Sequence, residues 1–347
     1  MKKLFSLIVL FSALLIAQTS FAQLHFTEDF SYPAGDSIGA HGWVYNTGTV
    51  NPLLVSSPGL TFTGYPSSGI GNALTVRSTG NDAYKNFTSN DSTGSVYCAF
   101  MVRVDTAKAT GDYFLAMISS TSTTNYAARV YAKDSLGFVA FGISKGTAAS
   151  GQGFSAPIYI KGTTYLLVSK YTFNPSTGDD VVSLYVFAGA MPTVEPPVAT
   201  VGPVTSTAGD SPNLGRVAIR QGSSTLAPTS VVDGIRVAEQ WSNISAIVNI
   251  STTVPDKFLL SQNYPNPFNP NTKINFALPV SGYVSLKVYN SIGKEVSTLV
   301  NERLNTGTYS VDFIGSNLNS GAYFYRLELS GENGKVFTEQ KKLMLVK

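Results

Sequence analysis

The sequence predicts an all-β protein made of two consecutive β-sandwiches. Short alternating runs, rich in β-branched and aromatic residues, recur between Gly, Asn, Asp and Ser turns along most of the 347 residues. Few segments show helical periodicity, and only 13% of the residues are charged. Near residue 263 a break rich in proline and asparagine precedes a new set of alternating runs, so a second domain is expected there.

The first residues predict export. Lys2 and Lys3 precede the apolar run Leu4–Ala17, and Ser20-Phe21-Ala22 is a small-x-small cleavage signal. These features are typical of a secretory signal peptide over 1–22 that is cleaved after Ala22. A membrane anchor is the alternative, but the apolar run is too short and no positive flank follows it. We therefore expect no membrane span in the mature chain.

The charge distribution argues against a nucleic-acid-binding domain. Residues 24–250 hold 12 basic and 14 acidic side chains, and residues 251–347 hold 10 and 7. Neither part has the basic excess that binding to nucleic acid requires. Cys98 is the only cysteine, so no intrachain disulfide can form. Its alternating surroundings favour a small buried apolar residue over a nucleophile.

Eight strands are expected in the first domain, residues 24–243. A turn at 174–180 separates two of them, and the proline-rich connection 191–213 is expected to lie over the surface. So many strands in one domain favour a two-sheet sandwich over a small barrel. The expected strands are 95–104, 111–119, 126–133, 137–144, 163–173, 180–189, 214–222 and 230–241.

Four strand-and-turn patterns in this domain, 28–43, 179–192, 214–222 and 231–241, resemble bacterial concanavalin A-like, laminin-G-type jelly rolls. The resemblance implies a jelly roll whose first and last strands lie together. Relatives of that fold often bind glycans, and some cleave them, so a glycan-binding or adhesive module is expected. The alternatives are a polysaccharide-degrading enzyme and a purely structural surface protein.

We expect no catalytic residues in the first domain. Gly35–Gly39 fits the G-x-S-x-G pattern around Ser37, but no helix follows and the chain has two histidines, so a glycine-rich turn is the better interpretation. The E-x-D-x-x-E pattern of laminarinase-like glycosidases, a zincin helix, a P-loop and paired cysteines do not occur. An enzyme that uses scattered carboxylates and tyrosines remains the alternative.

Calcium is the one cofactor that the first domain suggests. Glu28 and Asp29 open the first strand and Asp233 lies on the last, so pairing of these strands would bring three oxygen ligands together. The alternative is that they are solvated or hydrogen-bonded turn residues. Trp43 and Trp241 flank the two ends of the domain. Either ring could stack on a sugar, but large aromatic residues in a sandwich are more often core.

The stretch NYPNPFNPNTKINF, residues 263–276, marks the start of the second domain. Its prolines fix φ and remove N–H donors, which gives a stiff extended lead-in. The small and polar residues of 244–259 predict a linker before it. The runs that follow predict about seven strands of an immunoglobulin-like sandwich over 260–347. They include 272–279, 283–290, 294–300, 307–315, 321–331 and 336–347.

This second domain is identified as a member of the type A C-terminal sorting domains of the type IX secretion system. The resemblance implies that the chain passes through the periplasm to the cell surface or the medium. It also implies two partners, the secretion machinery and a sortase-like peptidase that removes the domain and releases or anchors the rest. The matching residues are Tyr264, Pro265, Asn266, Pro267, Phe268, Gly293, Gly307, Gly321, Tyr323, Lys341 and Lys342.

Overall fold

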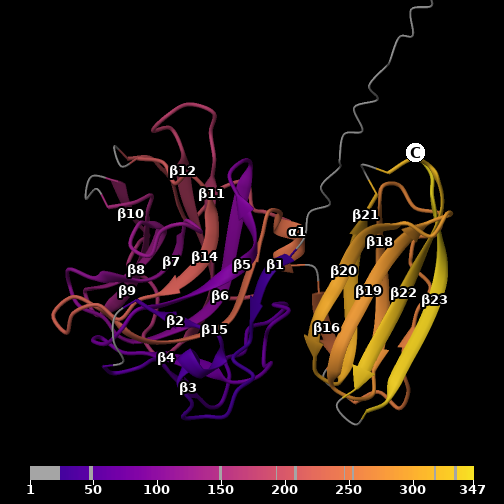
Figure 1. Cartoon of the computed structure of the whole chain (residues 1–347), viewed down its shortest axis with the longest axis horizontal. Helices are drawn as coiled ribbons and strands as arrows, with labels where there is room; N and C mark the ends of the chain where they lie inside the picture. The colour runs from indigo at the N-terminus through magenta and orange to yellow at the C-terminus, as the bar shows by residue number, and fades with distance from the viewer. Residues whose placement is uncertain are drawn as a thin grey trace, which may run out of the picture.

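The structure is a computed structural model that describes residues 24–46, 50–147, 151–192, 194–206, 209–245, 247–251, 254–315, 318–331 and 334–347. The predicted signal peptide, with its cleavage after Ala22, lies outside these residues. The described residues form two β-sandwiches in succession, as Figure 1 shows, which confirms the predicted all-β class. Two short helical segments are described, the 3-10 turn η1 (Ile38–His41) and α1 (Trp241–Ser245). No helix of the described residues is long and apolar enough to cross a bilayer.

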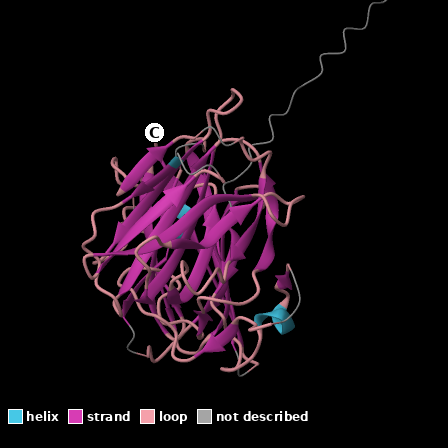
Figure 2. Cartoon of the chain, turned by 90° about the vertical axis from the view of Figure 1, so that its left-hand side faces the viewer, coloured by secondary structure: helices cyan, strands magenta, loops and turns pink. Residues whose placement is uncertain are grey.

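The first domain is a jelly-roll sandwich of two antiparallel sheets, whose strands dominate the view in Figure 2. The larger sheet consists, in spatial order, of β13 (Val201–Val204), β12 (Val181–Phe187), β11 (Thr164–Thr172), β6 (Ser95–Thr106), β15 (Thr229–Ala238), β4 (Ala73–Val76) and β3 (Leu54–Ser56), with β1 (Leu24–Glu28) also paired to β15. The smaller sheet consists of β10 (Gln152–Phe154), β9 (Phe138–Ser144), β8 (Tyr126–Ser135), β7 (Asp112–Ile118), β14 (Leu214–Ile219), β5 (Ala83–Asp91) and β2 (Val44–Tyr45).

All eight strands expected in this domain are present. β1 pairs antiparallel with β15, so the first and last strands lie together as the resemblance implied. The expectation that Glu28 and Asp29 open the first strand was wrong in its position, since β1 ends at Glu28. The sequence pattern did not identify β2 to β5, β10 and β13, because most of these strands are short or interrupted by turn residues. The core lies between the two sheets. There the Phe100 ring of β6 meets the Phe114 ring of β7 edge to face, with centroids 6.1 Å apart.

The described residues of the long connection 191–213 lie only partly over the outer face of the larger sheet, because Val201–Val204 form its edge strand β13. Glu195 in this connection accepts hydrogen bonds from the Tyr97 hydroxyl at 2.7 Å and from the Lys170 ammonium at 2.8 Å. The Trp241 indole N–H donates to the Pro192 carbonyl at 2.9 Å. The connection therefore covers Trp241, which is 5% exposed. Cys98 is fully buried, and this burial raises the pKa of its thiol, as suits an apolar core residue.

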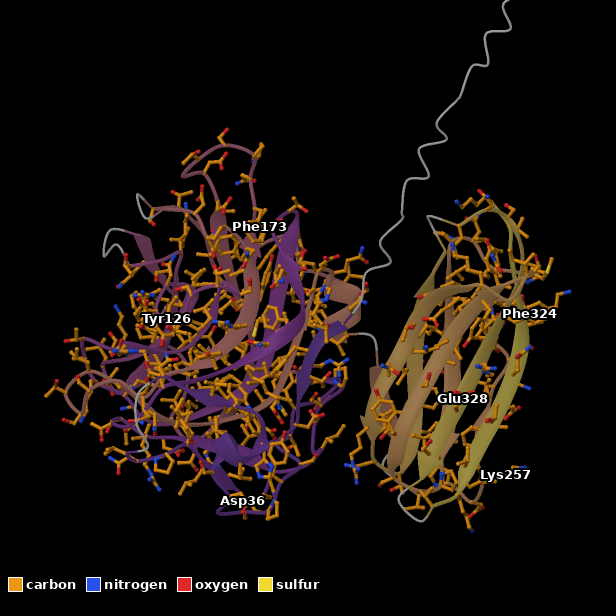
Figure 3. All side chains as sticks on the ribbon, viewed as in Figure 1. Asp36, Tyr126, Phe173, Lys257, Phe324 and Glu328 are labelled. Atoms are coloured by element: carbon orange, nitrogen blue, oxygen red, sulfur yellow. The ribbon has the colours of Figure 1, made fainter. Side chains whose placement is uncertain are left out.

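The second domain is a sandwich of two four-stranded sheets. One sheet has the order β16 (Ile247–Ser251), β21 (Gly307–Ile314), β18 (Asn271–Leu278) and β17 (Leu259–Leu260). The other has the order β20 (Glu295–Leu304), β19 (Gly282–Asn290), β22 (Gly321–Gly331) and β23 (Val336–Leu345). The predicted alternation is confirmed, since Val284, Leu286 and Val288 of β19 are fully buried. In β22, Phe324 and Glu328 lie on the outer face (Figure 3), whereas Tyr325 and Leu327 are buried.

Part of the predicted linker 244–259 is not a linker. Residues 247–251 form β16, which pairs with β21 of the second sandwich, Ile247 opposite Val311. The sequence pattern missed this strand because an edge strand needs backbone partners and carries only a weak side-chain signal.

The proline-rich opening stretch lies along the last strand, and we call its residues 264–268 the clasp. The Phe268 N–H donates to the Met344 carbonyl at 2.9 Å, and the Val346 N–H donates to the Phe268 carbonyl at 3.0 Å. The Asn266 side-chain oxygen accepts the Met344 N–H at 2.9 Å. The opening stretch thus satisfies part of the free edge of β23, which would otherwise expose unpaired backbone groups.

Tyr325 fixes the start of this stretch from inside the sandwich. Its hydroxyl accepts the Asn263 N–H at 2.9 Å and donates to the Ser261 carbonyl at 2.8 Å. The side chain is fully buried, and burial raises the pKa of its phenol to about 12. The hydroxyl therefore stays protonated and serves as a permanent hydrogen-bond partner.

We expect Tyr325→Phe to lower the free energy of unfolding of the second domain by about 1–3 kcal/mol, because it leaves a buried N–H without an acceptor. Urea denaturation followed by fluorescence would measure the loss. Tyr264→Phe is the matched control, since the Tyr264 side chain is 82% exposed and should tolerate the change. Equal stability of both variants would contradict the role assigned to Tyr325.

Candidate functional site

The side of the smaller sheet that faces away from the core carries an ordered set of rings and cations. In β8, Arg129, Tyr131 and Lys133 alternate with core residues, and in β14 Arg216 does the same. Ala116, Ala218 and Gly142 leave room between them, and the Phe154 ring lies over Gly142. The cationic face, as we name it, consists of Tyr84, Tyr113, Tyr126, Arg129, Tyr131, Lys133, Phe154, Arg216 and Arg220.

Each cation of this face lies over an aromatic ring. The Arg129 guanidinium is 4.6 Å from the Tyr113 ring centroid, and the Lys133 ammonium is 3.9 Å from that of Phe154. Arg216 lies 4.6 Å from the Tyr84 ring centroid. Such stacking holds a cation in place. Arg129 also donates from Nε to the Tyr126 carbonyl at 3.2 Å, and Arg216 donates to the Asn86 side-chain oxygen at 2.9 Å and to the Ser122 carbonyl at 2.8 Å, so only their remaining N–H groups can meet a ligand. The rings are largely covered, so a ligand approaching this face meets positive charge first.

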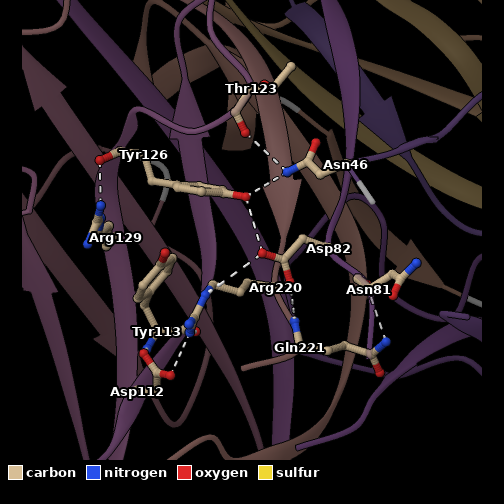
Figure 4. Close-up of polar contacts among 10 residues, drawn as sticks. All are labelled: Asn46, Asn81, Asp82, Asp112, Tyr113, Thr123, Tyr126, Arg129, Arg220 and Gln221. Atoms are coloured by element: carbon tan, nitrogen blue, oxygen red, sulfur yellow. Dashed lines mark hydrogen bonds and ion pairs between the residues drawn. The ribbon is translucent and has the colours of Figure 1, made fainter. Parts of the chain in front are cut away.

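Arg220 pairs with Asp82 and Asp112, the two carboxylates beside the cationic face, in a network of ion pairs and hydrogen bonds (Figure 4). Arg220 donates to Asp112 at 2.5 Å and its Nε lies 3.8 Å from Asp82. Asp82 also accepts the Gln221 N–H at 2.9 Å and the Tyr126 hydroxyl at 3.2 Å. Among the described residues, no carboxylate lies within 4.0 Å of Arg129, Lys133 or Arg216. These three cations can therefore bind an external anion.

The ionisation of this face suits binding better than proton transfer. Burial raises the pKa of Tyr113 and of Tyr126, so both phenols stay protonated at neutral pH. A tyrosine that acts as general base needs a lowered pKa instead. Burial also raises the pKa of Asp82, although its hydrogen bonds and Arg220 partly oppose the effect.

The sequence interpretation did not name any residue of the cationic face. A signal was present, since Arg129 and Lys133 and also Arg216 and Arg220 stand an even number of residues apart and so share a sheet face. The spacing does not show that β5, β7, β8 and β14 are neighbours in one sheet, which only the tertiary structure reveals.

Glu28, the first predicted calcium ligand, is occupied by protein donors. One of its carboxylate oxygens accepts the Phe30 N–H at 3.1 Å. The other accepts the Lys85 ammonium at 2.7 Å and the Trp43 indole N–H at 3.1 Å. This buried carboxylate therefore joins β1 to β5 and anchors Trp43, which is 3% exposed.

Asp233 is fully buried beside Asp29. Its two oxygens accept the N–H groups of Leu60 and Gly234, each at 2.7 Å. Burial raises the pKa of Asp233 to about 9, and the nearby Asp29 charge adds to the rise. In the described part of the chain, Glu28, Asp29 and Asp233 are not a group of three whose ligand atoms come within 4.8 Å of one another. The calcium site stays a prediction that rests on Asp29 and Asp233.

The remaining candidates of the first domain have structural roles. Ser37 precedes η1, and its hydroxyl lies 2.9 Å from that of Tyr45. His41 pairs with Asp36 at 3.0 Å and stacks on Tyr32, and no hydrogen bond between His41 and Ser37 occurs among the described residues. Trp43 and Trp241 are both buried, which confirms that they are core residues.

A cavity of about 430 Å³ lies between the two sandwiches. It is lined by β1 and the residues after it on one side and by β19 and β20 on the other. Its walls include His25 and Tyr32 from the first domain and Thr298 and Asn301 from the second. The cavity therefore exists only while the two domains are joined in this arrangement.

The predicted motif residues of the second domain lie in the proline-rich stretch, in a turn, in β21 and β22, and on the last strand. Gly307 begins β21, Gly321 begins β22, and Tyr323 is buried within β22. Asn266 and Phe268 bond to β23, whereas Tyr264 pairs through its backbone with Lys273 of β18, and Pro265 and Pro267 lie between these residues. Gly293 adopts φ of 79° in the turn after β19, where a side chain would be strained. Lys341 pairs with Glu339 at 3.2 Å, and the Lys342 carbonyl accepts hydrogen bonds from Gln262 and Asn266.

Several solved structures are similar to the chain at a low level. A glycosyl hydrolase family protein from Mycobacterium fortuitum is 10% identical, with a TM-score of 0.34 over 62% of this chain and 99% of that chain. Domain 4 of an extracellular arabinanase from Geobacillus stearothermophilus is 11% identical, with a TM-score of 0.32 over 65% of this chain and 99% of that chain. These values are too low to support any statement about function. No curated protein matches the chain.

The second domain has a family match. Residues 262–344 match the family described as the secretion system C-terminal sorting domain. The match begins just before the clasp and ends on β23, so it includes the clasp and the strand that it contacts. Residues 262–344 are therefore a C-terminal sorting domain, and the protein that carries them is exported by the type IX secretion system to the cell surface or the extracellular space.

Proposed function

We propose that the first sandwich is a glycan-binding module for acidic glycans and that the sorting domain delivers it outside the cell. The observation that carries the proposal is the cationic face, where Arg129, Lys133 and Arg216 stack on aromatic rings without a carboxylate partner among the described residues. Arginine pairs well with the planar carboxylate of a uronic acid or with a sulfate ester. Four cations against two carboxylates on this region favour an anionic ligand.

The alternative is that the first domain is an enzyme, because arginine and tyrosine side chains cluster on the cationic face. The raised pKa values of Tyr113 and Tyr126 argue against a tyrosine base. Asp82 and Asp112 are held by Arg220 and do not stand free as an acid–base pair. Binding therefore accounts for the geometry better than catalysis does.

We also propose the division of the chain into a cargo domain of residues 24–243 and a sorting domain of residues 260–347, with removal of the latter by a sortase-like peptidase. The chain between them includes Val254, which is 59% exposed, and β17 begins at Leu259. Exposed backbone outside a sheet is the kind of segment that a peptidase can draw into its active site.

The double substitution of Arg129 and Arg216 by Gln should weaken binding of uronate-bearing or sulfated glycans at least tenfold, because each charged hydrogen bond contributes about 1.5–3 kcal/mol. A glycan array followed by calorimetry on the mature protein would measure it. The control is Arg103→Gln, which removes one positive charge on the larger sheet, away from the cationic face. Equal loss in the control, binding of neutral glycans only, or release of cleaved product would contradict the proposal.

If Asp29 and Asp233 hold calcium, chelation should lower the melting temperature of the mature protein, and added calcium should restore it. A ligand that binds only the folded state at 100 times its Kd stabilises that state by about 2.7 kcal/mol. Differential scanning calorimetry with EGTA and calcium would measure the shift. Asp233→Asn should abolish the response, and unchanged melting of the wild type in both conditions would exclude the metal.

Deletion of Lys341–Lys347 should stop export and leave the full-length chain in the periplasm. The deletion removes the buried Leu343 and Leu345 and the strand residues that pair with Phe268. The loss of buried leucines alone costs about 2–5 kcal/mol each. Immunoblots of periplasm and medium would locate the protein. Normal secretion of the truncated chain would contradict the sorting role of this strand.

The exported wild-type protein should end between Ile250 and Leu260, on the C-terminal side of β16, because the exposed chain before β17 is the accessible site for cleavage. Intact-mass measurement on the surface and medium fractions would locate the new terminus. An exported form that still ends at Lys347 would show that the domain is not removed.

A further inference from the structure

Three ionisable side chains from three separate segments meet at one end of the first sandwich. His25 lies on β1, Asp91 ends β5, and Glu239 directly follows β15. The His25 Nε2 atom is 3.8 Å from a carboxylate oxygen of Asp91 and 3.6 Å from one of Glu239. One ligand atom from each residue lies within 4.8 Å of the other two.

The backbone directs His25 into this cluster. The register of β1 against β15 shifts between Leu24 and Phe26, so His25 occupies an irregularity of the strand. As a result His25 and Phe26 are both buried, whereas regular alternation would send them to opposite faces. The Thr88 hydroxyl of β5 donates to the His25 carbonyl at 3.0 Å and holds this position.

The imidazole nitrogen that points into the cluster lacks a hydrogen-bond partner. His25 Nε2 is buried and makes no hydrogen bond, and the His25 side chain is only 8% exposed. Distances of 3.6 and 3.8 Å are too long for hydrogen bonds. A buried polar atom in this state is costly. The two carboxylates beside it repel each other, and this repulsion is relieved either by a shared proton or by a cation between them.

We propose that His25, Asp91 and Glu239 bind a zinc ion. Tetrahedral zinc with bonds of about 2.0–2.2 Å holds its ligand atoms roughly 3.4 Å apart, so a small inward movement of these side chains would complete the site. One imidazole and two carboxylates suit zinc, whereas calcium prefers six to eight oxygen ligands. The Glu239 side chain is 36% exposed and His25 borders the cavity between the domains, which provides a path of entry and an open fourth position.

The same ion would fasten the first strand of the mature chain. β1 is the first described strand, and His25 is its second residue. Zinc bound to Asp91 of the smaller sheet and Glu239 after β15 would join both sheets of the sandwich to β1. The site is distinct from Asp29 and Asp233, and from the cationic face.

Zinc titration of the tag-free mature protein after removal of metal tests this site. We expect one zinc per chain and a rise in melting temperature with zinc concentration. His25→Gln and Glu239→Gln should each weaken zinc binding at least tenfold, and Glu239→Gln keeps shape at a partly exposed position if His25→Gln fails to fold. Cobalt substituted for zinc should give visible absorption bands in the wild type that His25→Gln removes.

His41→Gln is the matched control, since His41 is the only other histidine and pairs with Asp36. It should bind zinc as the wild type does. The absence of zinc binding by the folded wild type would leave an ion-paired cluster only and overturn the proposal. Undiminished binding by both His25→Gln and Glu239→Gln, or loss of binding in His41→Gln, would overturn it as well.

Discussion

The pairing of β1 with β15 is the constraint on which the polar features at this end of the first domain depend. It places the first strand of the described chain beside the last strand of the jelly roll, more than 200 positions away in the sequence. Once these strands pair, Asp29 comes close to Asp233, and His25 comes close to Glu239. The Glu28 carboxylate then joins β1 to Lys85 of β5, so the two sheets are connected through one strand.

In the sorting domain, too, the beginning of the domain contacts its end. The proline-rich stretch at its start lies against β23 at its end, and Tyr325 fixes the start from within the core. Proline suits this position because it fixes the extended backbone and has no N–H to leave unpaired at an edge. The domain thereby covers part of an edge that could otherwise pair with another chain during export.

The two domains differ in what their surfaces offer. The first presents cations that are stacked on rings and not neutralised by carboxylates among the described residues, an arrangement suited to an external anion. The second carries its motif residues mainly where they shape turns and the clasp. This division agrees with the binding role proposed for the first domain and with the sorting role of the second.

The sequence by itself determined the all-β class, the fourteen alternating runs that became strands and the position of the sorting domain. These features are local. The alternation of side chains along a strand and the effect of proline and glycine on a turn each depend on only a few neighbouring residues. It also indicated that Cys98, Trp43 and Trp241 are core residues. It missed β16 and the other short or edge strands, because their pairing partners lie elsewhere in the chain. Only the tertiary structure decided that Arg129 and Arg216 share one face and that an irregularity in β1 turns His25 toward Asp91. Strand order and register bring these residues together, and neither quantity is contained in the spacing of residues along one strand.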